Sequence, residues 1–231
     1  YHLLIWGGIS GYQYQLPNLK AGQTERKSLN ISLACDNKNQ FNRKLNALFH
    51  SSLENITISE EYQVITAGLV KNTNYFSCIL QDENTLLRQE DFAFTLESTN
   101  GVIDYTNTPV GTTPTCYLPY RQELSLTSEQ IPIIHARLNT LRIMKGDDTT
   151  LSIKHTPSGK TILHLPLTQY LLLSKNYPNN IGDISDQEYL DREDSYTLMF
   201  FIQSSDTGIP RIPTMKVNDW IIRLNDSELG S

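Results

Sequence analysis

The sequence predicts an all-β protein, organised as two β-sandwich domains in tandem. Short runs rich in Val, Ile, Thr, Tyr and Phe alternate apolar and polar residues, which is the period of a half-buried strand. Turn residues separate these runs at short intervals, and this spacing is typical of sandwiches. The pattern ends at a polar, proline-containing stretch and restarts after it, which predicts two domains.

The first half of the chain contains the runs expected to form the first sandwich. They are residues 1–6, 29–33, 55–59, 62–70, 75–81, 91–98 and 102–106. Hairpin turns are expected at Lys71 to Asn74 and at Asn100-Gly101, because Asn and Gly favour the backbone of tight turns. One helix is expected within residues 42–49, where Leu45 and Leu48 belong to an apolar stripe.

A domain boundary is expected near residue 125. The stretch 117–131 is polar, with Pro119 within it and Pro132 after it, and proline interrupts regular strands. We therefore predict an N-terminal sandwich over residues 1–124, lacking its first strands, and a C-terminal sandwich over residues 125–231. The chain opens directly on an apolar strand, so we expect an upstream segment that carries any targeting signal.

The second half repeats the alternation. Its expected strands are residues 138–144, 150–155, 161–167, 169–173, 195–203 and 216–224. Residues 157–159, Pro-Ser-Gly, are expected to turn a hairpin between the second and third of these strands. Ser185 to Glu188 has the spacing of a capping box, in which the two side chains satisfy the first amide groups of a helix. A short helix is therefore expected after Ser185.

A separate core is expected in each domain. Phe92, Phe94 and Leu96 share one face of a strand and are predicted to serve the first core. One face of a later strand is predicted to serve the second core through Tyr196, Leu198, Phe200 and Ile202. Met199 and Phe201 on the opposite face are apolar too, so this strand is expected to be central and covered on both sides.

Composition and cysteine content exclude several classes of function. The chain of 231 residues carries a formal charge of −6 and its cationic residues are scattered, so no nucleic-acid partner is expected. No apolar run reaches the roughly 18 residues that predict a membrane-spanning helix. Three cysteines do not make a disulfide framework. Cys35 and Cys78 fall on apolar faces of expected strands, which predicts that both are buried free thiols.

No catalytic residue, metal ligand or cofactor site is expected. The sequence lacks a G-x-S-x-G nucleophile turn, a CxxC pair and an EF-hand loop. His155 and His164 lie on the two arms of one expected hairpin, where a surface pair is favoured over a metal site. The acidic residues among 191–194 are interpreted as a solvated face. Tyr12 and Tyr14 are interpreted as packing residues, with a platform for stacking sugars as the alternative.

Seven strings resemble one family of bacterial surface proteins. They are residues 48–50, 54–58, 69–81, 91–107, 117–120, 187–202 and 217–229, and the similarity that they mark extends in order over nearly the whole chain. By these strings the chain resembles the FimB-type, fimbrillin-associated anchor proteins of Bacteroidales fimbriae. The resemblance implies two transthyretin-like β-sandwich domains in an outer-membrane lipoprotein that holds a fimbria to the cell and influences its length. The lipid-bearing cysteine of that family is not present in this chain.

The expected function is therefore that of a structural subunit of a surface fimbria, an anchor at the outer membrane. The partners that the resemblance implies are fimbrial shaft or accessory subunits, joined by strand exchange, and the outer membrane through an N-terminal lipid. The candidate subunit-contact strand comprises Val217, Trp220, Ile222 and Leu224. A cell-surface carbohydrate-binding sandwich is the alternative, and it should show an exposed aromatic platform. A hydrolase should show a cleft with convergent titratable groups.

Overall fold

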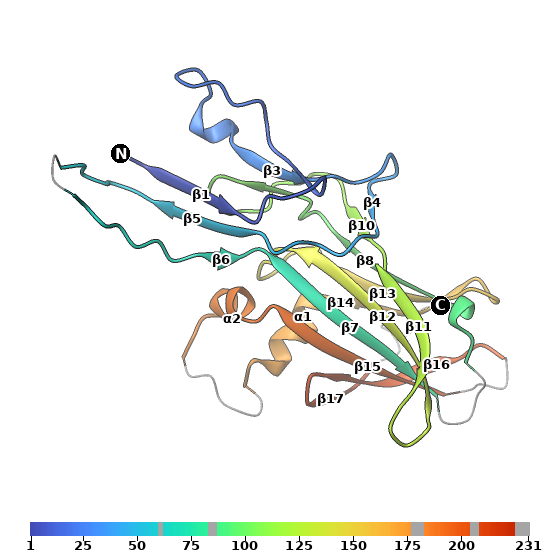
Figure 1. Ribbon diagram of the computed structural model, residues 1–231. Coiled ribbons are helices and arrows are strands. Elements are labelled where there is room, and N and C mark those ends of the chain that lie inside the picture. Colours follow the sequence, from blue (N-terminus) through green and yellow to red (C-terminus); the bar gives the residue numbers. More distant parts are fainter. Residues whose placement is uncertain (60–61, 83–86, 177–182, 204–207, 225–231) are drawn as a thin grey trace.

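The fold is all-β, as the alternation predicts, and the strands of the described residues form four sheets (Figure 1). The computed structural model describes residues 1–59, 62–82, 87–176, 183–203 and 208–224. In this part of the chain the α-helices are α1, Leu167–Leu173, and α2, Asp186–Arg192. Short 3-10 turns occupy Arg26–Ser28, Gln89–Asp91 and Ser174–Asn176. Among the described residues, no helix has the length and apolar character needed to cross a membrane.

The largest sheet has six strands in the order β11-β12-β7-β15-β16-β17. Its strands are β7, Thr73–Gln81; β11, Arg121–Leu126; β12, Pro132–Leu141; β15, Ser195–Gln203; β16, Arg211–Val217; and β17, Trp220–Arg223. β7 and β15 run parallel, and the other neighbouring strands are antiparallel. β15 is central in this sheet, as predicted, but Met199 and Phe201 on its outer face are only half-buried.

The second large sheet has five strands in the order β14-β13-β8-β10-β4. Its strands are β4, Gln40–Phe41; β8, Phe92–Ser98; β10, Thr115–Tyr117; β13, Thr150–His155; and β14, Lys160–Pro166. The predicted hairpin over residues 157–159 is confirmed as β13-β14, with an irregular register after Ile153. β4 lies parallel to β10, so the N-terminal part of the chain contributes an edge strand to this sheet.

One continuous core includes residues from both large sheets. Phe76 of β7 stacks on Tyr196 of β15, with ring centroids 5.6 Å apart. Phe94 of β8 belongs to the same buried cluster as Leu198 and Phe200 of β15. Burial of such aromatic and aliphatic side chains is the main source of stability for this architecture. The expectation of a separate core on each side of residue 125 is not met.

The strand pairing crosses residue 125 and does not follow the expected division into 1–124 and 125–231. β7, from before that point, pairs with β12 and β15 from after it, and β8 pairs with β13. The polar stretch includes the edge strand β11 and a turn closed by a 2.9 Å hydrogen bond from the Thr127 N–H to the Ile131 carbonyl. An edge strand borders solvent, so polar composition and nearby prolines suit it as well as they suit a linker.

Two smaller sheets, each of three strands, are built mainly from the first third of the chain. Their orders are β1-β5-β6 and β2-β3-β9. Their strands are β1, Leu3–Gly7; β2, Tyr14–Gln15; β3, Asn30–Leu33; β5, Phe49–Leu53; β6, Val70–Lys71; and β9, Val102–Asp104. Figure 1 shows both of them to one side of the large sheets. β9 is the strand that comes from later in the chain.

The helix expected within residues 42–49 is wrong, because residues 42–48 run as an extended segment into β5. Side chains from elsewhere replace the helical hydrogen bonds. The Leu45 N–H donates to Oδ1 of Asn139 at 2.9 Å, and the Leu45 carbonyl accepts from the Tyr75 hydroxyl at 3.1 Å. Leu45 and Leu48 are fully buried. The apolar pattern that suggested a helix thus consists of residues that reach the core from a segment that is not helical.

Two expected hairpins are wrong because their strands enter different sheets. Residues 62–69 are not strand, and β6 holds only two residues before the chain enters β7. At that junction the Asn72 N–H donates to the Leu48 carbonyl at 2.7 Å, instead of closing a turn. Asn100-Gly101 is a turn as predicted, but β8 before it and β9 after it belong to separate sheets. Residues 55–59 are likewise not strand.

Three smaller expectations have mixed outcomes. α2 begins as the capping box predicts, since the Ser185 side chain accepts a 3.1 Å hydrogen bond from the Glu188 N–H. Residues 169–173 lie in α1 and not in a strand. Cys78 is a fully buried free thiol, as predicted, whereas Cys35 is free but only half-buried. Burial raises the pKa of both thiols.

Candidate functional site: an open strand edge and its arm

β1 has one edge that no described strand covers. It pairs with β5 in antiparallel register, from Leu3 opposite Leu53 to Gly7 opposite Phe49, and it is the outermost strand of its sheet. Its sequence, LLIWG, contains neither a charged residue nor a proline. These are the residues that usually prevent an edge from pairing with another chain. Among the described residues, β1 is therefore an edge without the features that usually block strand addition.

An apolar arm continues this sheet away from the body of the molecule. The arm consists of residues 54–69, between β5 and β6, of which residues 54–59 and 62–69 are described. Its large apolar side chains are exposed, including Ile58 at 61%, Tyr62 at 94% and Val64 at 73%. Figure 1 shows the arm reaching beyond the other sheets. Exposed apolar surface of this extent marks an interaction site more often than a solvated loop.

The chain ends of the arm are tied to the rest of the protein by polar contacts. Tyr1 and Ile56 exchange two hydrogen bonds, 2.7 Å from the terminal amino group and 2.8 Å to the Tyr1 carbonyl. Where the arm returns, the Lys71 ammonium lies 2.5 Å from the Asp194 carboxylate and 4.9 Å from the centre of the Tyr75 ring. These contacts hold the ends of the arm while its middle carries the exposed apolar side chains.

A second ion pair supports the same region from α2. The Arg142 guanidinium binds both oxygens of Asp191, at 2.9 and 2.6 Å, and also donates to the Asn107 carbonyl. The Asn107 side chain in turn accepts from Asn72 at 2.5 Å. The acidic residues interpreted as a solvated face are thus partly structural, because Asp191 and Asp194 each hold a cation. Bidentate, partly buried pairs of this kind fix geometry better than exposed pairs do.

The inner side of β1 and β5 packs around a buried histidine. His50 lies 6.0 Å from Trp6, measured between ring centroids, and its Nε2 is 3.1 Å from the Tyr105 carbonyl oxygen. Burial lowers the pKa of His50, and the hydrogen bond to Tyr105 partly offsets that effect. The indole N–H of Trp6 is buried without a hydrogen-bond partner among the described residues. His50 is therefore a neutral packing residue near pH 7.

The C-terminal contact strand expected from the sequence is divided by a turn. Asn218 has a positive φ of 49° and reverses the chain between β16 and β17. Val217 is fully buried in β16, and Ile222 and Leu224 pack against the core. Trp220 retains 39% exposure. β17 is the outermost described strand of the six-stranded sheet, so it offers a second edge but a smaller apolar surface than β1 and the arm.

The residues considered for catalysis or metal binding do not converge. His164 is 2.9 Å from the Ser152 hydroxyl and His155 is 2.9 Å from that of Ser158, so the two rings bind different partners. Within the described ranges, no group of three metal-ligating side chains forms a candidate metal site. Tyr12 is exposed, but Tyr14 is buried and donates to the Asn46 carbonyl. These two tyrosines therefore do not make an aromatic platform.

Comparison with known proteins places this chain among fimbrial proteins. The minor fimbrium anchoring subunit Mfa2 of Porphyromonas gingivalis is 24% identical over 187 residues, which are 79% of this chain and 55% of that protein. The chain thus spans just over half the length of this curated relative.

Solved structures share the fold. The fimbrial anchor protein Mfa2 from Porphyromonas gingivalis matches with a TM-score of 0.74 at 21% identity, over 97% of this chain and 76% of that chain. A candidate adhesin from Bacteroides thetaiotaomicron matches with a TM-score of 0.80 at 25% identity, over 97% of this chain and 77% of that one. The family model described as fimbrillin-A associated anchor proteins Mfa1 and Mfa2 matches residues 1–226. This chain therefore belongs to the family of fimbrillin-A associated anchor proteins.

Proposed function

We propose that this chain is a structural subunit of a bacterial surface fimbria, and that it anchors the fimbria at the outer membrane and limits its length. The family is one of structural anchor proteins rather than enzymes. The family match over residues 1–226 supports a fimbrial role. The Porphyromonas gingivalis relative is named as an anchoring subunit, which supports the anchor role in particular.

The observation that carries the proposal is the open edge of β1 with its apolar arm. A strand from a shaft or accessory subunit that aligns with β1 gains main-chain hydrogen bonds from the unpaired edge. Its alternate apolar side chains pack beside those of β1, such as the 42% exposed Leu3. A fimbria needs joints that resist pulling, and a continuous ladder of backbone hydrogen bonds supplies one. The membrane partner would be reached through a lipid on a segment that this sequence does not include.

β17 is the second candidate joint. This strand contains Trp220 and the 67% exposed Ile221, but it also contains the charged Arg223. Val217 and Ile222, which the sequence placed in the contact, are used by the core and are not available to a partner. We therefore propose β1 as the main joint, and β17 as a site where a smaller contact adds to it.

Deletion of the protein from its host tests the anchor role. Fimbriae on cells are compared with fimbriae in the medium by electron microscopy and immunoblotting. Without its anchor the host should shed fimbriae or carry abnormally long ones. Normal attachment and normal length after deletion would refute the anchor role and favour the carbohydrate-binding alternative.

A pair of matched variants tests the joint. Complementation with Leu3→Lys places a charge on β1, where the side chain is already 42% exposed, so the fold should survive. Ile221→Lys places the same charge on β17 as the control. Leu3→Lys should reproduce the shedding of the deletion strain, whereas Ile221→Lys should restore attachment. Full attachment with Leu3→Lys, with both variants expressed at equal level, would exclude β1 as the joint.

A further inference from the structure

The outer face of the six-stranded sheet carries an apolar row that crosses its strands. Ile79 of β7 lies opposite Met199 of β15, and Met199 lies opposite Lys216 of β16. Lys216 continues the row to Ile221 of β17, because residues that lie opposite each other project from the same face of a sheet. Ile79 and Met199 are half-buried and Ile221 is 67% exposed, whereas the neighbours of Ile79 and Met199 in sequence are fully buried in the core. This face therefore offers apolar surface to a partner.

The outer face of the five-stranded sheet differs in character. The row that crosses β8, β13 and β14 there consists of Thr95, Ser152 and His164, all of them polar. Apolar side chains are thus not a general feature of the outer faces of this protein. Their presence on the six-stranded sheet alone of the two indicates a contact surface.

Cationic side chains accompany the apolar row. Four of them lie in the row or beside it on the same face: Arg121, Arg137, Lys216 and Arg223. Glu123 pairs with the first two, at 2.7 and 3.4 Å, and Asp219 pairs with the third, at 3.2 Å. Four cations against two carboxylates leave this face positive, in a chain whose overall formal charge is −6.

The arm, residues 54–69, has the opposite charge and the same apolar character. Its sequence contains three glutamates but neither lysine nor arginine. Its exposed apolar side chains include Ile65 at 44% and Leu69 at 52%, in addition to Val64 at 73%. An acidic segment with apolar side chains complements an apolar surface that is framed by cations.

The dimensions of the two surfaces agree, but the arm cannot reach the face on its own molecule. Residues 62–69 span at most about 26 Å, and six strands spaced about 4.8 Å apart give a face about 24 Å wide. Figure 1 shows the arm and β7 extending in opposite directions from β6. The contacts of Tyr1 and Lys71 hold the two ends of the arm in that position. A second molecule therefore has to supply one of the two surfaces.

We propose that the arm of one copy of this chain docks on the outer face of the six-stranded sheet of a second copy. The partner is a second copy because the same chain carries both complementary surfaces. Apolar side chains of the arm cover Ile79, Met199 and Ile221, and its glutamates lie towards the cations. The contact joins two different surfaces, so it links copies head to tail. β1 and residues 62–69 lie on opposite sides of β5, so the edge of β1 stays available to a fimbrial subunit.

Sedimentation of the full chain tests the association. The weight-average mass should rise with protein concentration and should pass that of a dimer, because a head-to-tail contact does not close. Raising NaCl from about 0.05 to about 0.5 M should weaken the association about fivefold, since opposite charges attract across the contact. A chain that stays monomeric up to about 1 mM would overturn the proposal, whatever else the arm binds. Association that is indifferent to salt would also overturn it.

Two variants, one on each surface, locate the contact. Val64→Lys places a cation on the arm, and Ile221→Asp places an anion on the sheet face. Each variant alone should associate at least about tenfold more weakly than the parent. An equimolar mixture should form a dimer that does not grow further, because one variant supplies an intact face and the other an intact arm. Loss of association in only one of the two variants, or a mixture that stays monomeric, would refute a head-to-tail contact.

Two further variants are controls. Leu19→Lys changes a residue that is 53% exposed between β2 and β3, and it should associate as the parent does. Leu3→Lys changes the edge of β1 and should associate equally well. Circular dichroism checks that each variant is folded. Loss of association in Leu3→Lys would place the contact at the β1 edge and would exclude the arm, independently of whether β1 serves as the fimbrial joint.

Discussion

A single buried amide shows how this chain satisfies an extended segment inside its core. Asn139 lies in β12 with no exposed surface, and its two polar atoms bind the backbone of the 42–48 segment. Its Oδ1 accepts from the Leu45 N–H at 2.9 Å and its Nδ2 donates to the Arg43 carbonyl at 3.3 Å. Buried backbone groups that are outside helices and sheets need such partners. Asn139 thereby replaces hydrogen bonds that a helix would have supplied.

Asn139→Ala should destabilise the protein by about 1–3 kcal/mol, because the buried Leu45 N–H loses its acceptor and a buried group without a partner costs about that much. The free energy of unfolding is measured by urea denaturation. Asn18→Ala, at an exposed position, is the matched control and should change it by less than about 0.5 kcal/mol. Equal stability of the two variants would mean that the 42–48 segment does not depend on this amide.

His50 should make the protein less stable in mild acid. Burial, together with Arg142, lowers its pKa in the folded state, while the hydrogen bond to Tyr105 and the charge of Asp104 act in the opposite direction. An unfolded histidine has a pKa near 6.5, so as the pH falls below about 6.5 the unfolded state takes up a proton that the folded state refuses. Stability is thus complete above that pH and is lost below it.

The measurement is the urea midpoint of the parent and of His50→Gln between pH 8 and pH 5. Gln keeps an N–H donor near the Tyr105 carbonyl but does not titrate in this range. The variant should lose less stability on acidification than the parent does. His135, whose pKa burial also lowers, leaves a residual slope in both proteins. Identical slopes would show that His50 is not the group responsible.

At the scale of single elements, the sequence predicted the structure correctly where a few neighbouring residues determine the local conformation. The capping box at Ser185 starts α2, and the turn at residues 157–159 joins β13 to β14. The sequence patterns gave wrong predictions where a strand pairs with a segment far away in the sequence. Alternation identified β7 and β8 as strands, but their neighbours lie far along the chain, and nothing in a period of two specifies them. The apolar stripe at Leu45 and Leu48 also fits two conformations.

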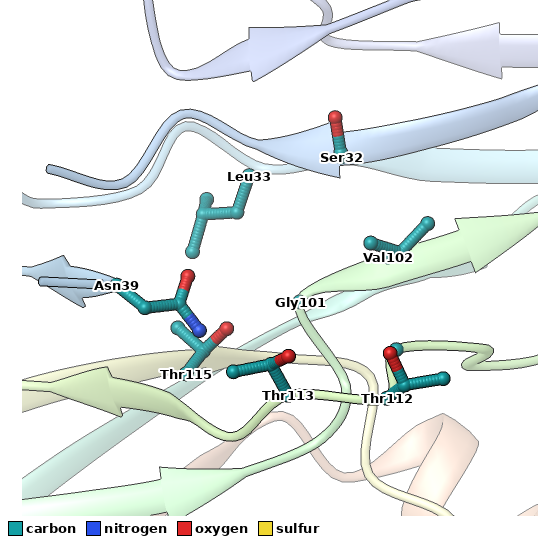
Figure 2. Close-up of a pocket in the computed structure, with 9 residues that line it drawn as sticks. Ser32, Leu33, Asn39, Gly101, Val102, Thr112, Thr113 and Thr115 are labelled. Carbon is teal, nitrogen blue, oxygen red and sulfur yellow. The ribbon is translucent and has the colours of Figure 1, made fainter. Parts of the chain in front are cut away.

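The same limit applies to the candidate site. The alternating apolar run at residues 1–6 identified β1 as a strand, and its edge is apparent only once β5 is known to be its described partner. A small hollow beside β3 (Figure 2) is lined by four separate segments, at residues 32–33, 39, 101–102 and 111–115, and the threonines of its loop carry no signal of their own. Sites built from several loops are accessible to sequence reasoning only after the fold is known.

Ser185→Ala should shorten or loosen α2 and lower the free energy of unfolding by about 1 kcal/mol, the usual cost of losing an N-cap. Ser185→Asp retains an oxygen acceptor and should stay close to the parent. Urea denaturation gives both values, and the amide exchange rate of Glu188 reports the cap directly, because its N–H is the donor. A loss of stability as large in Ser185→Asp as in Ser185→Ala would indicate an effect other than capping.

At the scale of the whole molecule, the large sheets behave as one unit that spans residue 125. β7 contributes to the centre of the six-stranded sheet and β8 to the centre of the five-stranded sheet, while their neighbours β12, β13 and β15 come from after that point. A cut at residue 125 would remove partners from both sheets and expose the core on each side. Cooperative folding of the two parts together follows from this pairing.

Expression of residues 1–124 and 125–231 as separate chains tests this cooperativity. Each fragment alone should lack cooperative thermal unfolding and should give a poorly dispersed amide NMR spectrum. The intact chain should show coincident transitions by near- and far-ultraviolet circular dichroism, as two-state unfolding requires. A well-dispersed spectrum from either fragment would instead establish it as an independently folding domain.

The position of β7 between two strands from later in the sequence also determines when β7 can fold. β7 ends at Gln81, but its neighbours begin only at Pro132 and Ser195. During synthesis, neither edge of β7 can pair until β12 or β15 has been made, which is after more than half of the chain. Contacts between residues so distant in sequence form slowly, and the waiting chain is prone to aggregate. A chaperone or translocation machine that binds the unfolded chain therefore acts before the six-stranded sheet has formed. The sheet then folds in one late, cooperative step.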